Sequence, residues 1–513
     1  METLRADAVV IGAGLGGLSA AGHLAAEGRH VVVLEHHLVP GGYAHEFKRR
    51  GFRFEVALHA LDGVGPGGWA HPMLLDLGVL DRVVFQRLDP FYTARFPDHE
   101  ITAWAEMPEY LKELKANFPN EAAGIDDLFA ATGRIGHDMG RYLKDRRGGM
   151  RSSPAESMVR YPDMSAAFGR DWASFLDGYL ADPQLKAVVS ALWGYLGLPP
   201  SRISAGLFAL VILSYHTGGA WYPQGGSQAM SRAIADTIVE RGGEVRYRNT
   251  VTRIEVSRGR AVAVETDRGI RVEADVIISN ASPLDTVRMA GEEHVDEAYL
   301  ASLISDEPAL SNLVVYVGVG RDPIELGWPH HEYFQSESYD LEADYEAMVT
   351  GAFDRAGLVI AQYTDADPGC APEGCSVLAV MTLASWNHAD VWGTGGDLTN
   401  YSDSSRYQEV KAVAAEALLE RVEGLIPRLR GSIVVQEVAT PLTNHRYGLA
   451  PHGSIYGREQ TVANMLVRRS RRTPIPNLLL AGAWVGGGGM TAAIGSGRSA
   501  ARTADRLLSE LDH

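Results

Sequence analysis

Apolar residues at the start of the chain form a short unbroken run, then a helical stretch, then a second run. Ala8 to Ile11 is typical of a strand buried on both faces of a parallel sheet. Leu18 to Ala26 holds strong helix formers and no proline, and Gly28 ends this predicted helix. Val31 to Leu34 form a second buried strand. The pattern predicts a strand–helix–strand unit.

Later segments alternate between helical blocks and short strands. We predict helices over residues 108–118, 171–180, 183–196, 203–215, 231–241 and 404–425. Short apolar or alternating runs predict strands over residues 244–247, 251–256, 260–266, 272–279, 313–319 and 377–383. The sequence contains no internal repeat. This order of predicted helices and strands indicates a nucleotide-binding unit that is interrupted by inserted segments.

The turn between the first strand and the first helix has the spacing Gly12-x-Gly14-x-x-Gly17. In such a turn the first glycine permits a tight bend, the second admits a pyrophosphate, and the third lets helix and strand pack closely. The helix N-terminus adds unpaired donors and a positive dipole end. Glu35 follows the second strand, where a carboxylate can accept hydrogen bonds from a ribose. These features together predict a dinucleotide site.

Composition narrows the class of protein. The 513 residues suit two domains, or one nucleotide domain with large insertions. A net charge of −17 and the lack of a long basic run argue against a nucleic-acid partner. The two cysteines, Cys370 and Cys375, are too few for a disulfide framework or a zinc site. We therefore expect no metal, and two thiols in a reducing, cytoplasmic compartment.

No segment of the sequence reads as a membrane span or a signal peptide. The first apolar run leads directly into the glycine motif, so it belongs to the fold. The apolar segment Ile203 to Tyr215 is shorter than the roughly 20 residues that cross a bilayer. We predict a core helix there. The alternatives are that it lines an apolar substrate tunnel or touches a membrane surface as a peripheral contact.

Further motifs carry a resemblance to a known family. Glu35-x5-Gly41-Gly42 near the start, together with Leu480-Ala-Gly482 and a glycine-opened helix at the end, resembles the FAD-dependent amine oxidase and phytoene desaturase superfamily. The turn at 221–227 resembles one in carotenoid desaturases, and segments 274–283 and 440–457 are similar to the carotenoid isomerase and retinol saturase branch. That branch has Asp where Glu55 stands and Gly where Ala57 stands, so we expect this loop to be displaced.

The resemblance implies an α/β fold with a two-lobed, glutathione-reductase-like FAD-binding Rossmann domain and an inserted mixed α+β substrate domain. It implies that residues 1–85, 222–305 and 431–513 bind FAD and that residues 86–221 and 306–430 bind substrate. We predict cofactor contacts from Gly12, Gly14, Leu15, Gly16, Gly17, Glu35, His36, Gly41, Gly42, Tyr43, His59, Ala60, Val251, Gly482, Ala483, Gly489, Met490 and Thr491. In the family the closing helix points its N-terminus at the flavin pyrimidine.

The predicted reaction is chemistry at carbon–carbon double bonds of a lipophilic polyene, similar to a carotenoid or retinoid. His59 is the candidate proton shuttle, and Tyr222, His445 and Tyr447 are candidate substrate contacts. Saturation, desaturation and isomerisation all remain open, as do the electron donor or acceptor and the oligomeric state. The alternatives are a flavoenzyme that oxidises an amine or another natural product, and a non-catalytic lipid- or prenyl-binding relative.

A second glycine cluster, Gly63-Val-Gly65-Pro-Gly-Gly68, also fits the dinucleotide spacing. Pro66 removes an N–H donor that a phosphate would need, and Pro72 is expected to break the following helix. We interpret the cluster as a loop beside the flavin. Without a second Rossmann unit, NADPH has no obvious binding site.

Overall fold

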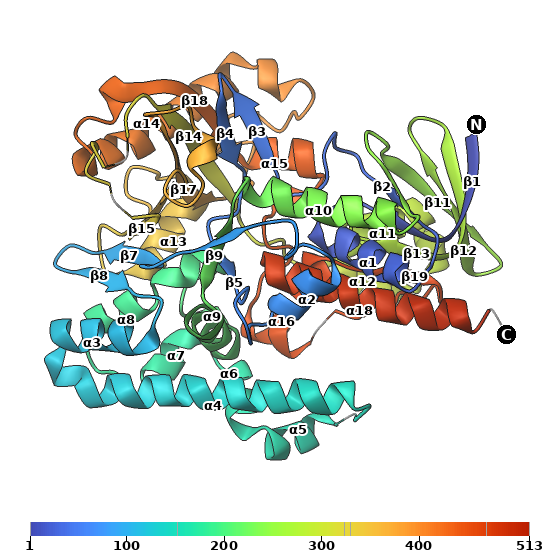
Figure 1. The fold of residues 1–513 in the computed structure, drawn as a ribbon, viewed down its shortest axis with the longest axis horizontal. Coiled ribbons are helices and arrows are strands. Elements are labelled where there is room, and N and C mark those ends of the chain that lie inside the picture. Colours follow the sequence, from blue (N-terminus) through green and yellow to red (C-terminus); the bar gives the residue numbers. More distant parts are fainter. Residues whose placement is uncertain (1, 151, 323, 329, 468, 512–513) are drawn as a thin grey trace.

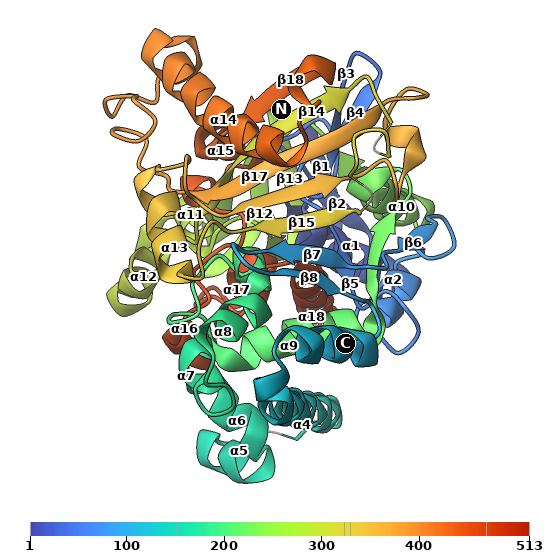
Figure 2. The same cartoon turned by 90° about the vertical axis from the view of Figure 1, so that its left-hand side faces the viewer.

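The computed structural model describes residues 2–150, 152–322, 324–328, 330–467 and 469–511 and contains two large sheets (Figures 1 and 2). In the first sheet, β1 (Glu2–Ile11) pairs in parallel with β2 (Val31–Leu34) and with β13 (Ile270–Ser279). Residues Ala8 to Ile11 are buried, as the apolar run predicted. The remaining strands are β10 (Glu244–Arg246) beside β2, and β12 (Arg260–Thr266), β11 (Val251–Ser257) and β19 (Leu478–Leu480) on the β13 side.

Three helices pack against this sheet, and two of them touch through glycine. Helix α1 (Leu15–Ala26) lies between α10 (Gly226–Glu240) and α18 (Met490–Ser509) (Figure 1). A Cβ on Gly497 would lie 2.1 Å from the carbonyl oxygen of Gly16, and one on Gly17 would lie 2.0 Å from that of Gly12. Larger residues cannot occupy either position without moving the backbone. The close packing expected of the third glycine is therefore present.

The second sheet has the order β18-β14-β17-β16-β15-β7-β8 and is seen in Figure 2. Its strands are β18 (Ile433–Ala439), β14 (Ser311–Val319), β17 (Ser376–Ala384), β16 (Leu358–Gln362), β15 (Glu332–Gln335), β7 (Tyr92–Arg95) and β8 (Glu100–Ala103). Helix α14 (Ser405–Leu425) covers one face, while α13 (Leu341–Thr350) packs on the other. Strand β18, which follows the boundary expected at 431, is hydrogen-bonded to β14 within this sheet.

A helical segment lies beneath the second sheet (Figure 2). It comprises α3 (Met107–Asn117), α4 (Ala122–Arg147), α5 (Pro154–Arg160), α6 (Pro162–Phe168), α7 (Trp172–Leu176), α8 (Pro183–Val189) and α9 (Ala205–Gly218). The predicted helix 171–180 ends at Leu176, and the predicted helix 183–196 divides into α8 and a 3₁₀ turn, Ala191–Tyr195. Helix α4 was not predicted because its glycines weaken the pattern; Gly136 lies against Leu213 of α9.

The second glycine cluster is a turn between β5 (Leu61–Asp62) and α2 (His71–Asp76). The backbone N–H groups of Ala70 and His71 donate to the Gly63 carbonyl oxygen. Pro72 stands in the first turn of α2, where no intrahelical N–H is needed, so the expected helix break is wrong. Strand β5 joins β9 (Ala220–Pro223) and β6 (Phe85–Arg87) in a small sheet.

The remaining helices connect the two large sheets. They are α11 (Pro283–Ala290), α12 (Glu297–Ile304), α15 (Pro441–Gly448), α16 (Val462–Leu466) and α17 (Ala483–Gly486). Among the residues that the structure describes, no helix combines the length and apolarity needed to cross a bilayer. The predicted apolar segment 203–215 forms most of α9 and packs in the core.

A hairpin of β3 (Glu46–Arg49) and β4 (Phe52–Glu55) carries a buried acidic cluster that makes stability depend on pH. Burial raises the pKa of Glu46 to about 8, Glu55 and Asp367 raise it too, and Arg53 at 3.2 Å only partly opposes them. Because the folded-state pKa exceeds the unfolded value, this contribution to stability is complete below the unfolded pKa and is lost as pH rises through about 8.

We therefore expect the free energy of unfolding to fall between pH 6 and pH 8 by up to about 1.4 kcal/mol per pH unit. In the Glu46→Gln variant, this part of the pH dependence of the free energy of unfolding should be absent. Denaturant unfolding at both pH values checks the prediction, and an identical slope in the variant would contradict it.

Candidate active site

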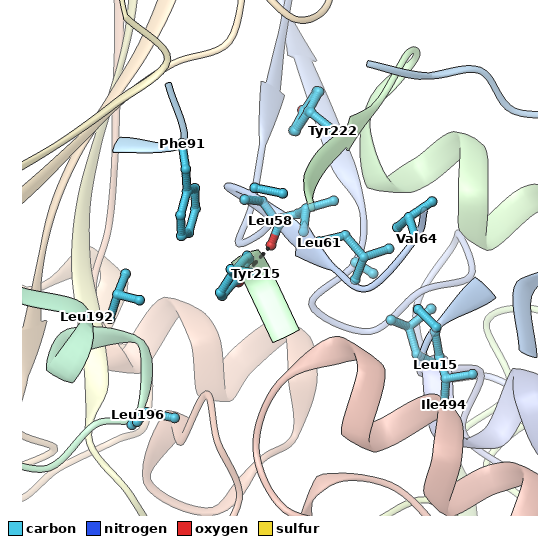
Figure 3. Packing of buried hydrophobic residues seen from close by; sticks show 14 of the residues in the cluster. Leu15, Leu58, Leu61, Val64, Phe91, Leu192, Leu196, Tyr215, Tyr222 and Ile494 are labelled. Atoms are coloured by element: carbon cyan, nitrogen blue, oxygen red, sulfur yellow. Dashed lines mark hydrogen bonds between the residues drawn. The ribbon is translucent and has the colours of Figure 1, made fainter. Parts of the chain in front are cut away.

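A single large cavity runs from the glycine turn of the first sheet to the face of the second sheet. Its volume is about 2490 Å³, whereas pockets for one small molecule usually measure roughly 300–1,000 Å³. Tyr215 and Leu58 line the cavity, and Figure 3 shows them among buried apolar side chains, with Phe91 stacked on Tyr215. The cavity has room for a dinucleotide and for a second, apolar molecule.

Glycines form the wall of the cavity at the N-terminus of α1. Gly14 and Gly16 line the cavity, and a Cβ on Gly16 would lie 2.4 Å from Oδ1 of Asn280 and 2.6 Å from the Cα of Gly482. The Oδ1 atom of Asn280 is buried and has no hydrogen-bond partner among the described residues. A glycine cradle at a helix N-terminus fits a bound pyrophosphate, because the backbone N–H groups there are donors. The Asn280 oxygen is an acceptor and suits a donor group of a ligand instead.

Glu35 ends β2 and is almost fully buried beside this cradle. Its Oε2 accepts a hydrogen bond from the backbone N–H of Ala13 at 2.5 Å, and Oε1 accepts one from that of His37 at 2.6 Å. Burial raises the pKa of Glu35, and these two donors lower it. Glu35 therefore also fixes the backbone on both sides of the site, a role that the sequence did not indicate.

Replacing Glu35 with alanine leaves two buried N–H groups without acceptors. An unsatisfied buried donor costs about 1–3 kcal/mol. We therefore expect the variant to bind its cofactor with a roughly tenfold higher Kd. Equilibrium dialysis of the released cofactor measures this Kd. The exposed Glu27→Ala substitution on the same unit is the matched control. Equal retention in both variants would show that Glu35 has no role in binding.

Residues from two segments, one after β2 and one at the start of β11, line the far end of the cradle. His36 lies after β2, and its Nδ1 is 3.0 Å from Oγ1 of Thr250. Thr250 and Val251 stand at the start of β11 and line the same end, as the position of Val251 predicted. The predicted residues Gly41, Gly42 and Tyr43 also line the cavity, and Tyr43 donates to the Gly453 carbonyl oxygen at 3.0 Å.

The N-terminus of α18 opens onto the middle of the cavity. Gly482, Ala483, Gly489, Met490 and Thr491, which are predicted cofactor contacts, line the cavity there. The Thr491 hydroxyl donates to Oδ1 of Asp62 at 2.7 Å, and the Ser214 hydroxyl of α9 donates to Oδ2 at 2.5 Å. Asp62 thus joins three elements at the helix N-terminus. The sequence analysis did not identify it.

His59 lines the cavity from the loop that follows β4. Its Nδ1 lies 2.7 Å from Oε1 of Glu332, which is fully buried on β15. The Tyr195 hydroxyl donates to the other carboxylate oxygen at 2.5 Å. Burial and the charge of Glu332 raise the pKa of Tyr195 well above its usual value, so this hydroxyl stays protonated. The carboxylate therefore holds an imidazole and a phenol at one wall of the cavity.

Glu55 anchors the loop that carries His59. Oε1 accepts hydrogen bonds from the Ser227 hydroxyl at 2.7 Å and from the backbone N–H of Leu58 at 3.2 Å, and Oε2 accepts one from the Ser227 N–H at 2.8 Å. Its side chain is 2% exposed. Glu55 thus ties the loop that carries His59 to Ser227 of α10.

The predicted substrate residues lie in different places. Tyr222 is buried outside the cavity lining, where its hydroxyl donates to Glu55 at 3.3 Å, so it has a structural contact and does not reach the cavity. His445 lines the cavity, and its Nδ1 lies 2.9 Å from the Ala450 carbonyl oxygen. Tyr447 lines the cavity with half of its surface exposed. Ala60 and Leu15 also line it, whereas Gly17 lies behind the turn.

The described residues hold no group of three or more His, Cys, Asp or Glu side chains placed to bind a metal ion. The cavity brings together the glycine cradle, the N-terminus of α18 and the His59–Glu332–Tyr195 set. A glycine cradle that opens into an apolar cavity between two sheets fits an enzyme of α/β fold that binds a nucleotide cofactor and an apolar molecule.

The family model for flavin containing amine oxidoreductase matches residues 15–504. The chain belongs to this family.

Two relatives resemble the chain over most of its length. An all-trans-retinol 13,14-reductase of Danio rerio is 27% identical, over 93% of this chain and 82% of that protein. A prolycopene isomerase of Arabidopsis thaliana is 27% identical, over 88% of this chain and 74% of that protein. Both lie in the branch to which the sequence motifs pointed.

Solved structures share the fold. An oxidoreductase from Methanosarcina mazei superposes with a TM-score of 0.64 at 18% identity, over 97% of this chain and 99% of that one. Putrescine oxidase bound to putrescine gives 0.62 at 17% identity, over 99% and 100%. The expected fold class, the family and the flavin chemistry are thereby confirmed.

Proposed function

We propose that the protein is an FAD-dependent oxidoreductase that acts on carbon–carbon double bonds of a lipophilic polyene. The observation that carries the proposal is His59, which faces an apolar cavity and is held by the buried carboxylate of Glu332. The names of the retinol reductase and prolycopene isomerase relatives support a retinoid- or carotenoid-like substrate.

The glycine cradle, Glu35 and the residues around Val251 would hold the dinucleotide, with the N-terminus of α18 beside the flavin ring. A flavin supplies electron and hydride transfer when bound. The cavity size supports FAD over a mononucleotide because the cradle, the Glu35 corner and the α18 N-terminus are all parts of one continuous space. The first lobe would bind cofactor, and the second sheet with the helical segment would bind substrate.

Reduction of a double bond needs a proton at the second carbon, and a positioned imidazole can supply it. Glu332 accepts from Nδ1 of His59, which leaves Nε2 as the ring nitrogen available to the cavity. Tyr195 completes the carboxylate's hydrogen bonds and stays protonated. This arrangement favours net saturation or desaturation over isomerisation, in which no proton is consumed.

The proposal includes contact with a membrane surface, from which a lipophilic substrate would enter. Large apolar side chains are exposed on α5 and at the end of α16, and both helices pack on α6. They are Met158, Val159, Leu466 and Val467. Such a patch is suited to shallow insertion at a bilayer interface.

The test begins with the cofactor: protein denatured after purification should release FAD and not FMN. Reduced protein is then mixed without oxygen with conjugated polyenes, and reoxidation of the flavin is followed by absorbance. Reoxidation by a polyene supports the proposal. A flavin that polyenes never reoxidise, in a protein whose oxidised flavin is bleached by amines, would instead make this an amine oxidase.

A further inference from the structure

Three solvent-exposed arginines from separate elements line the cavity at one end. Arg146 lies in the last turn of α4, Arg471 precedes β19, and Arg506 lies near the end of α18. In the part of the chain that the structure describes, no carboxylate forms an ion pair with any of the three guanidinium groups. The nearby Asp505, which lines the same end, is paired with Arg29 at 2.9 Å.

The three cations repel one another without an acid to compensate them. Partial loss of hydration lowers the pKa of Arg471, and the charges of Arg146 and Arg506 lower it further. The whole chain has a net charge of −17, so this end of the cavity has the opposite sign to the protein as a whole. Guanidinium groups that line one part of a cavity without acidic partners can bind carboxylate or phosphate oxygens.

An apolar channel leads from these arginines to the centre of the cavity. Helices α4 and α9 run side by side in opposite directions, since Gly136 lies against Leu213 while Leu143 packs with Leu207. The side chains that line the cavity along this channel are Met139, Tyr142, Leu143, Leu207, Leu210 and Val211. The channel ends at Ser214 and Tyr215, beside Asp62 and the loop of His59.

Helix geometry sets the length of this channel. Ser214 and Leu207 are seven positions apart on α9, which spans about 10 Å at 1.5 Å per residue. One further turn on α4, from Leu143 to Arg146, adds roughly 5 Å. An anionic group on the arginines would therefore lie about 15 Å from the reacting centre.

We propose that Arg146, Arg471 and Arg506 form a binding site for the anionic end of an amphipathic substrate, a carboxylate or phosphate, whose apolar chain lies between α4 and α9. This inference rests on the proposed function for the identity of the reacting end. The substrate would thus be an acidic lipid with its reacting double bond about 15 Å from the charge, rather than a neutral hydrocarbon.

The test compares a conjugated C18 tetraene fatty acid with its methyl ester. Both are dialysed to equilibrium against the flavin-loaded, oxidised protein without oxygen, in which the double bonds cannot be reduced, and recovery of unchanged ligand is verified by mass. The acid should bind about tenfold or more tightly than the ester, since two or more charge-assisted hydrogen bonds are lost with the charge. The combined variant Arg146→Gln, Arg471→Gln, Arg506→Gln should bind acid and ester equally, with ester affinity unchanged.

The matched control is Arg268→Gln, which removes the same charge from the exposed turn between β12 and β13 and should keep the preference for the acid. Equal affinities of acid and ester for the unmodified protein would overturn the proposal. So would a preference that survives in the combined variant while its flavin content is normal.

Vesicles separate a substrate in the channel from a bilayer headgroup. The monomeric acid should compete for the site in the absence of lipid. In one contrary outcome, the acid and the ester bind alike, and the combined variant differs only in no longer floating with vesicles that contain phosphatidylglycerol. The arginines would then contact bilayer lipid, and the proposal would be wrong. Because binding is measured without turnover, failure of the double-bond chemistry would leave the acid preference intact, and the two failures are distinguishable.

Discussion

Replacing His59 with glutamine should slow reoxidation of the reduced flavin by a polyene about 10²- to 10⁴-fold, the usual contribution of a positioned acid or base. Glutamine keeps a polar group of similar reach beside Glu332 but cannot deliver a proton. Flavin content should change little, because the side chain of His59 has its hydrogen bond to Glu332 and its backbone carbonyl accepts from His331. Stopped-flow absorbance under anaerobic conditions measures the rate.

His71→Gln is the matched control for this variant. The Nδ1 atom of His71 also has a single close partner, the Val64 carbonyl oxygen at 2.7 Å, but His71 does not line the cavity. The His71→Gln variant should reoxidise its flavin at a rate within about twofold of that of the unmodified protein, as expected for a substitution away from the site. Equal rates for His59→Gln and the unmodified protein would remove His59 from the reaction.

Replacing Glu332 with glutamine should slow the same reaction on the order of 10²-fold, because the imidazole loses the acceptor that fixes its tautomer and orientation. The carboxamide can donate to Nδ1 instead of accepting from it. The side chain is fully buried, and glutamine conserves its volume, so the fold should be retained. The rate is measured as for His59, with flavin content as the check on folding.

Tyr195→Phe separates the two partners of Glu332. It removes the phenol hydrogen bond and leaves the contact between His59 and Glu332 in place. We expect a smaller loss than for Glu332→Gln, of about tenfold or less, since only one neutral donor is removed. A larger loss in Tyr195→Phe than in His59→Gln would make the tyrosine the proton donor and contradict the assignment.

The local sequence predicted the strand–turn–helix–strand unit that carries Glu35, because its parts follow one another along the chain. The glycine turn, α1, β2 and Glu35 lie within 35 residues and depend on backbone geometry that specific residue types enforce. The closing helix was recognisable by its glycines, which a close crossing with α1 requires at Gly497.

The substrate end could not be predicted in the same way. Glu332 lies on β15, 273 positions from His59 in the sequence, and only the fold brings the two side chains into contact. Asp62 and Ser214 are 152 positions apart. Nothing in the sequence around Glu332 or Asp62 marks either carboxylate as different from a surface acid. Tyr222 was predicted to contact substrate because the turn at 221–227 resembles one in carotenoid desaturases. The direction of its side chain depends on a contact with Glu55, which is 167 positions away in the sequence.

The mass of the product from a single anaerobic turnover tests the central claim most directly. Chemically reduced protein is mixed with one equivalent of a conjugated polyene, and the product is weighed by mass spectrometry while the flavin spectrum is recorded. We predict a product with two more hydrogen atoms than the substrate and a fully oxidised flavin. A product of unchanged mass but changed double-bond geometry, with the flavin still reduced, would contradict net redox chemistry and make the protein an isomerase.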